Sequence, residues 1–163
     1  MIARVCAAAL LAASLVSAGC AEAPVTAPFE LTLKLSDKLV AELSAKNETI
    51  IVAASFYGDP NAKGAPEVDE MGLIQLGEER TELPPASGPV LVNAVADPAK
   101  IALIEGGVKV NVNIFSGRKS SEDNLISCDF IDGPVDELTA QPTEISCGLI
   151  TEDPPTMMKP AKG

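Results

Sequence analysis

The sequence predicts a mainly β protein, folded as an antiparallel β-sandwich or a small barrel, with one short helix after the first strand. Apolar and polar residues alternate along several segments, as they do in half-buried strands. Seven or eight such segments follow one another at intervals of about 10–18 residues, separated by Gly, Pro and Asn, which is typical of an all-β domain. The chain has 163 residues, 47% of them hydrophobic, and is long enough for one domain with its own core.

The first strand and the helix after it have clear local signals. Residues 29–36 alternate apolar and polar side chains, with leucine at three alternate positions, as in a strand with one buried face. Ser36 is a preferred N-cap residue, and the apolar stripe after it predicts a short helix that runs to Lys46. Asn47 is expected to end this helix.

The next segments are expected to form the middle of a sheet. Residues 49–57 (TIIVAASFY) are apolar on both faces, which suits a central strand. Gly, Asp, Pro and Asn at 58–61 predict a turn. Further strands are expected at 71–77 and 80–83, before the proline-rich residues 84–89 interrupt the pattern.

The second half of the chain contains the remaining strands. We expect strands at 90–96 and 100–105 and, after two glycines, at 108–114. In the last of these, valine and isoleucine alternate with lysine and asparagine, which makes it the clearest strand in the chain. The final two predicted strands carry Cys128 and Cys147.

The first 19 residues have the organisation of a secretory signal peptide. Arg4 is their single charged residue, an apolar stretch of about a dozen residues follows, and small residues precede Cys20. The apolar stretch is shorter than the roughly 20 residues that a membrane-spanning helix needs. We therefore expect the segment to be removed during export.

Residues 16–20, Val-Ser-Ala-Gly-Cys, resemble the lipobox of bacterial lipoprotein precursors. The resemblance implies that Cys20 receives a thioether-linked diacylglycerol and becomes the first residue of the mature chain. Several acyl chains attach a protein stably to a membrane, whereas one chain binds only marginally. Ala21 lacks the aspartate associated with inner-membrane retention, so the resemblance implies a periplasmic protein anchored to the outer membrane. The alternative is ordinary cleavage after Ala18, which gives a secreted or soluble periplasmic protein.

These signals divide the chain into four parts. They are the signal peptide (1–19), a lipid-anchored tether (20–28), the β-sandwich domain (29–150) and a flexible C-terminal tail (151–163). The tether is rich in Pro and Ala and spans at most about 25 Å. The domain is therefore expected to stay close to its membrane.

Two of the four cysteines remain once Cys6 is removed with the signal peptide and Cys20 is lipidated. Cys128 and Cys147 both follow the dipeptide Ile-Ser, so strand alternation directs both sulfurs to the same side. An even number of cysteines in an oxidising compartment predicts a disulfide. Its closed loop of about 20 residues corresponds to roughly 3 kcal/mol of stabilisation. A redox-active pair usually has the closer Cys-x-x-Cys spacing.

Composition excludes several kinds of partner and chemistry. The chain has 12 basic and 23 acidic residues, so loss of Arg4 with the signal peptide leaves 11 against 23, a net charge of −12. Such a surface repels nucleic acid and bare anionic lipid. Histidine is absent, which excludes Ser-His-Asp and Cys-His catalysis and histidine-ligated metals. We expect no cofactor, and aromatic platforms for sugars or single strands are scarce because the chain has no Trp and one Tyr.

One tetrapeptide matches a known catalytic spacing. Ser116-Gly-Arg-Lys119 satisfies the S-x-x-K pattern of penicillin-binding proteins and β-lactamases, in which the serine opens a helix. Here the serine follows a predicted strand, and neither a Ser-Asp-Asn nor a Lys-Thr-Gly element is found. We therefore interpret the tetrapeptide as part of a solvated hairpin loop.

Several carboxylates lie beside turn residues. Asp129, Asp132 and the pair Glu122-Asp123 offer oxygen ligands to a hard cation such as calcium, although no segment matches an EF-hand. A metal site is not predicted, and a structural cation stays an alternative. The paired glutamates 78–79 point to opposite faces of a strand and are not expected to share a substrate.

The leading functional hypothesis is a non-catalytic module that binds an envelope protein or assembly component. The candidate interaction loop, residues 117–124, carries both signs of charge on Arg118, Lys119, Glu122 and Asp123. The aromatic pair Phe56-Tyr57 is a second candidate, although Phe56 is expected to pack in the core. The alternatives are a carrier of a small apolar ligand inside a barrel and a small hydrolase that uses a Ser-Lys or carboxylate pair.

The body of the chain also resembles a group of uncharacterised proteobacterial lipoproteins. The resemblance is carried by FYGDP at 56–60 and by the segment NVNIFSGRKSSEDNLISCDFIDGP at 111–134. It covers most of the mature chain and implies no particular activity.

Overall fold

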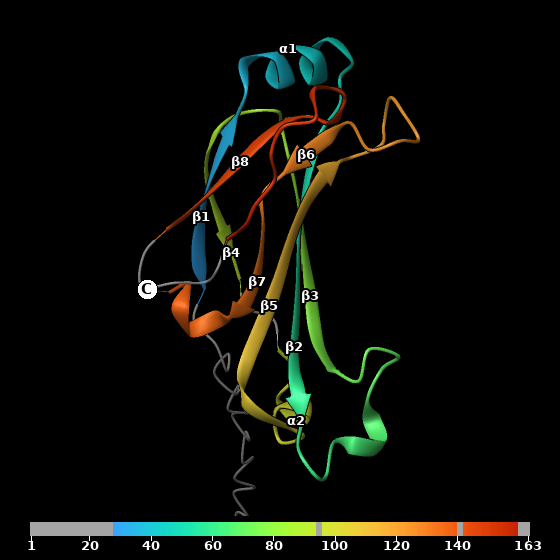
Figure 1. Ribbon diagram of the computed structural model, residues 1–163, viewed down its shortest axis with the longest axis vertical. Helices are drawn as coiled ribbons and strands as arrows, with labels where there is room; N and C mark the ends of the chain where they lie inside the picture. The colour runs from blue at the N-terminus through green and yellow to red at the C-terminus, as the bar shows by residue number, and fades with distance from the viewer. Residues whose placement is uncertain (1–27, 94–95, 140–141, 160–163) are drawn as a thin grey trace, which may run out of the picture.

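The computed structural model describes residues 28–93, 96–139 and 142–159 and folds them into two packed β-sheets (Figure 1). The four-stranded sheet has the order β4 (Gly88–Val92), β1 (Phe29–Leu35), β8 (Thr143–Leu149), β6 (Ile126–Cys128). The five-stranded sheet has the order β3 (Ile74–Leu83), β2 (Ile50–Pro60), β5 (Ile104–Ser116), β7 (Phe130–Pro134), β9 (Met158–Lys159). Within the described residues the two sheets do not close into a barrel, so the predicted β-sandwich is confirmed.

Most neighbouring strands are antiparallel, as predicted, but two pairs are parallel. β8 lies parallel to β1, and β9 lies parallel to β7. Parallel neighbours need a long connection between them. The chain supplies one for β1 and β8 because it builds most of the other sheet before it returns to the first.

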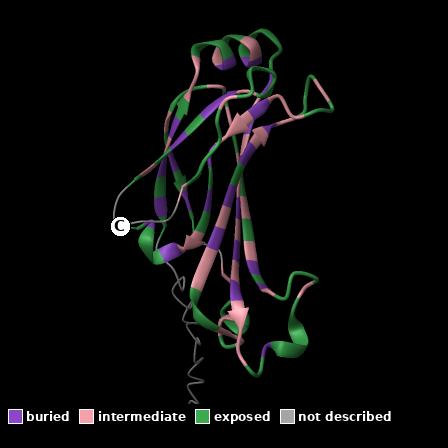
Figure 2. Ribbon diagram, in the orientation of Figure 1, coloured by how far each residue is buried: buried purple, intermediate pink, exposed green. Residues whose placement is uncertain are grey.

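The core lies between the sheets and follows the alternation along the strands (Figure 2). β2 alternates buried and half-buried residues over most of its length, and its Phe56 is fully buried. Fully burying a side chain of this size contributes about 1.5–3 kcal/mol relative to leaving it in water. β2 lies between β3 and β5, which confirms the predicted central strand and the core position of Phe56.

In the described residues, two α-helices connect strands. In α1 (Asp37–Ala45), the predicted cap is present because the Leu39 amide donates to Ser36 Oγ at 3.2 Å. Asn47 follows with a left-handed φ of 51°, as expected of a residue that ends a helix. The second helix is α2 (Pro98–Ile101). Among the described residues, no helix combines the length and the hydropathy needed to cross a membrane.

Three single-turn 3-10 helices complete the elements of the part of the chain that the structure describes. They are η1 (Ala65–Glu67), η2 (Val135–Glu137) and η3 (Ile150–Glu152). The strand predicted at 100–105 is wrong in its first part, because Asp97 caps α2 through the Ala99 amide and Pro98 begins the helix. Only its last two residues belong to β5.

Other boundaries also differ from the prediction. The two strands expected at 71–77 and 80–83 are one strand, β3, which bends at Gly77, where the pairing with β2 shifts register. The turn expected at 58–61 begins only at Asn61, whose side chain accepts the amides of Lys63 and Gly64. β4 starts earlier than expected and ends at Val92. β9 brings part of the segment assigned to a flexible tail into the five-stranded sheet.

Candidate functional site

The predicted disulfide is present. Cys128 in β6 lies directly opposite Cys147 in β8, with their Cα atoms 4.1 Å apart and the sulfurs bonded. The bond links the edge strand β6 to its neighbour β8, an inner strand of the four-stranded sheet. The second cysteine of the pair also belongs to the buried core.

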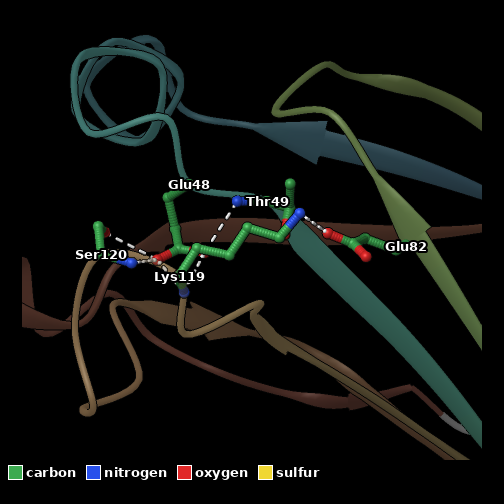
Figure 3. A network of polar contacts seen from close by, with 5 residues as sticks. All are labelled: Glu48, Thr49, Glu82, Lys119 and Ser120. Carbon is green, nitrogen blue, oxygen red and sulfur yellow. Dashed lines mark hydrogen bonds and ion pairs between the residues drawn. The ribbon is translucent and has the colours of Figure 1, made fainter.

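A buried carboxylate lies beneath the candidate interaction loop. Glu48, between α1 and β2, is 1% exposed. Its oxygens accept the backbone amides of Thr49 (2.9 Å), Lys119 (3.0 and 3.1 Å) and Ser120 (2.8 Å), and the Ser120 hydroxyl (2.8 Å). Figure 3 shows the carboxylate directed toward the backbone at Lys119 and Ser120. Its donors are therefore all neutral groups.

These donors keep Glu48 ionised. Burial alone raises the pKa of a carboxyl group because it removes water from the charged form. Hydrogen bonds from Ser120, Thr49 and Lys119 act in the opposite direction and outweigh burial, so the pKa of Glu48 falls from 4.5 to about 2. The charge is therefore present across the physiological range and holds two segments that are far apart in the sequence.

The loop begins with a close approach to the strand beside it. The Gly117 amide donates to the Thr49 carbonyl at 2.8 Å. A Cβ atom on this glycine would lie 2.0 Å from Thr49 Oγ1, so a larger residue does not fit unless the Thr49 side chain moves. Arg118 then adopts a left-handed φ of 57°, which turns the chain so that the next two amides face Glu48.

A second set of hydrogen bonds closes the other end of the loop. Asn124 Oδ1 accepts the Ser116 amide at 2.9 Å, and Ser116 Oγ accepts the Leu125 amide at 3.1 Å. Asn124 also donates to the Ile126 carbonyl at 2.7 Å. The loop is therefore fastened at both ends, by Glu48 at one and by Asn124 at the other.

The structure separates the two residues of the S-x-x-K pattern. Ser116 is fully buried at the end of β5, and its hydroxyl is used in the contacts with Asn124 and Leu125. The Lys119 ammonium instead forms an ion pair with Glu82 on β3, and this hydrogen bond lowers the pKa of Glu82 (Figure 3). Within the described residues, no hydrogen bond joins Ser116 to Lys119.

The loop leaves several charged side chains exposed. Arg118, Lys119, Glu122 and Asp123 are all exposed. The loop lies at the same end of the sandwich as α1, and β1 runs toward that end (Figure 1). The described chain begins at the opposite end of β1.

Two of the carboxylates considered for a cation, Asp129 and Asp132, have other partners. Asp132 accepts the Tyr57 hydroxyl at 2.5 Å, and burial together with this bond raises the pKa of Tyr57. Asp129 is 3% exposed and accepts two backbone amides and the Lys159 ammonium. Glu79 accepts the side-chain amide of Asn93. In the part of the chain that the structure describes, no three acidic or cysteine residues gather as metal ligands.

Sequence reasoning did not identify Glu48, Asn124 or the contacts of Asp129. Glu48 is 71 and 72 residues away from the donors in the loop, and nothing in its own neighbourhood indicates them. The one local signal is that an acidic residue lies between a helix-ending asparagine and an apolar strand. A carboxylate buried at such a position needs hydrogen-bond donors.

The signal peptide and Cys20, the proposed lipidation site, lie outside the described residues, as does the tether apart from Pro28. No protein-family model, curated protein or solved structure matches the chain. The functional proposal below therefore depends on the geometry of the loop and on the sequence of the leader.

Proposed function

We propose that the protein is a lipid-anchored periplasmic binding module, held to the outer membrane through Cys20, that contacts an envelope protein through residues 117–124. It works without catalysis. The observation that supports this proposal best is the buried Glu48 carboxylate, which fixes the base of the loop. A loop that is already ordered loses less conformational entropy on binding, and this favours its use as a contact surface.

The direction of β1 supports the choice of this loop. β1 has seven residues, and a strand of that length spans about 20 Å. A tether before Phe29 would enter about midway along the long axis of the molecule, while the loop lies near one end, beyond the far end of β1 (Figure 1). The exposed charges of the loop would then point away from the anchoring membrane and toward a partner.

The disulfide supports an extracytoplasmic location. It joins Cys128 and Cys147, the two cysteines that remain after processing at Cys20. Disulfides persist in oxidising compartments such as the periplasm and are rare in the cytosol. The bond therefore agrees with a chain that is exported.

The fold gives less support to the alternatives. A Ser-Lys hydrolase needs Lys119 beside the hydroxyl of Ser116, which the structure buries and bonds to other groups. A carrier needs an apolar cavity of several hundred Å³. A pocket between β3 and α2 in the described part of the chain measures about 170 Å³, and its lining includes the charged residues Glu67, Asp69 and Lys100, which do not suit an apolar ligand.

Site-specific photo-crosslinking in the native cell envelope tests the contact surface. A photoreactive amino acid at Glu122 in the loop is compared with one at Glu70, an exposed position in the segment before β3. We expect one discrete crosslinked protein from position 122 and none of that mass from position 70. The same bands from both positions, or none from position 122, would contradict the loop as the contact surface.

The anchor is tested separately by Cys20→Ser. Intact-mass measurement of the detergent-extracted wild-type protein should show cleavage before Cys20 and the added mass of a diacylglycerol. The variant should lack the added mass of the diacylglycerol. A wild-type protein without that mass, or a variant that still carries it, would refute lipidation at this residue and leave the crosslinking result unaffected.

A further inference from the structure

The end of the described chain is bound to the edge of the five-stranded sheet. In β9, Met158 lies opposite Phe130 and Lys159 lies opposite Ile131, in a parallel arrangement. The Phe130 amide donates to the Met157 carbonyl at 3.2 Å. Residues 157–159 therefore bind as an extended strand to the first two residues of β7.

A buried carboxylate recognises this strand. Asp129 lies where the chain passes from β6 in one sheet to β7 in the other, and it is 3% exposed. One carboxylate oxygen accepts the Met157 amide at 2.8 Å. The other accepts the Ser146 amide at 3.1 Å and contacts the Lys159 ammonium at 3.2 Å. The site thus recognises a backbone N–H and a cationic side chain two residues later.

The bound segment gains little from apolar packing. Met157 and Met158 are each 56% exposed, and Phe130 beside them is 36% exposed. The paired stretch has only two residues, and prolines at 154 and 155 precede it. Its attachment therefore depends on Asp129 and on a few backbone hydrogen bonds.

We propose that Asp129 and the outer edge of β7 form a strand-addition site for an extended peptide segment with a lysine or arginine two residues after its first bound amide. Residues 157–159 occupy this site as a displaceable internal ligand. The partner is a protein that offers such a segment. This inference goes beyond the proposed function and does not depend on the contacts of the loop.

The open edge of β7 favours an external segment over the internal one, and the charge of the site favours a cationic segment. Within the described residues, β9 pairs with Phe130 and Ile131 only, while β7 continues to Pro134. A longer segment therefore has additional backbone groups available for pairing, which is how added strands gain affinity. A cationic segment also suits a chain whose formal net charge is −11 and whose site contains a buried carboxylate.

Peptide binding to the full mature chain tests this proposal. The probe is a fluorescently labelled, C-terminally amidated peptide of residues 154–159, PPTMMK. The site is opened with Met157→Pro and Lys159→Glu, which remove the donating amide and reverse the charge. We expect the peptide to bind the opened variant at least tenfold more tightly than wild type, because the internal strand no longer competes. A probe with glutamate in place of its lysine should not bind.

Each outcome supports or overturns the proposal. Adding Asp129→Asn to the opened variant should abolish binding, and circular dichroism establishes that both variants are folded. If the opened, folded variant binds no better than wild type, or if both probes bind equally, the proposed site is wrong. If wild type forms dimers that Lys159→Glu dissociates, the occupant is a second copy, and the proposal of an internal ligand is overturned.

Discussion

Two buried carboxylates each hold a segment that is distant in the sequence, and they do so in different ways. Glu48 accepts only neutral donors, which are the neighbouring Thr49 amide and groups of a loop that β5 and β6 hold at both ends. Asp129 accepts a lysine ammonium and an amide from the end of the described chain, where the paired strand has two residues. Similar chemistry therefore gives a permanent contact in one place and a releasable contact in the other.

The difference arises from how the donors are connected to the fold. The amides of Lys119 and Ser120 cannot leave Glu48 unless the loop distorts between two strands, and a buried charge without partners is costly. The amide of Met157 and the ammonium of Lys159 can leave together, because in the described residues they belong to a paired strand of only two residues. After release, Asp129 still accepts the Ser146 amide.

Loss of the Glu48 charge should have the largest effect on stability. Glu48→Gln replaces one acceptor oxygen with an NH2 group, which then lies against buried N–H donors of the loop. We expect the free energy of unfolding to fall by about 3 kcal/mol. Urea denaturation measures this change, with Glu30→Gln, an exposed glutamate on β1, as the matched control. Equal effects of the two substitutions would contradict the role of Glu48.

The pH dependence of stability should report the ionisation of Glu48. Because the pKa of Glu48 is about 2 in the folded protein and ordinarily 4.5, its contribution is complete above about pH 5 and is lost as the pH falls toward 2. The shift corresponds to about 3 kcal/mol. Denaturation of wild type and Glu48→Gln across this range should show their stability difference shrinking. A difference that stays constant would contradict the low pKa.

Gly117→Ala should be the next most damaging change. The new Cβ would lie 2.0 Å from Thr49 Oγ1, and we expect a loss of about 2 kcal/mol because the contact is overpacked. The double variant with Thr49→Ala removes that oxygen and should recover more than half of the loss. Thermal unfolding of both variants checks this. No recovery in the double variant would refute steric conflict as the cause.

Substitutions of the two lysine side chains should have the smallest effects. Lys159→Ala releases β9 without exposing the core, and we expect a change of less than about 1 kcal/mol in global stability. Lys119→Met removes the exposed pair with Glu82 and should cost about 0.5 kcal/mol, since its backbone amide still reaches Glu48. If urea denaturation showed that Lys159→Ala lowers the free energy of unfolding as much as Glu48→Gln does, the comparison would be contradicted.

The features predicted correctly depend on local patterns. Alternation over residues 29–36 and 108–114 identified β1 and most of β5, because each strand buries one face. The repeated Ile-Ser-Cys context identified the disulfide, since equal positions on neighbouring strands face the same side. The helix cap at Ser36 was likewise visible in the sequence.

The features that were missed depend on contacts between distant segments or on competing signals. Glu48 meets Ser120 across 72 residues, and Asp129 meets Met157 across 28, so no local pattern reports either contact. For α2, the capping aspartate and the proline at 97–98 were visible, but the apolar residues after them favoured a strand. The parallel position of β9 depends on the sheet edge that β7 leaves open.

Amide hydrogen exchange of the folded wild-type protein tests the comparison most directly. If Glu48 holds a permanent contact and Asp129 a releasable one, the amides of Lys119 and Ser120 should exchange only through global unfolding. The Met157 amide should then exchange through local opening, at least about 100-fold faster. Equal protection of Met157 and of the two loop amides, or rapid exchange of the loop amides, would contradict the account.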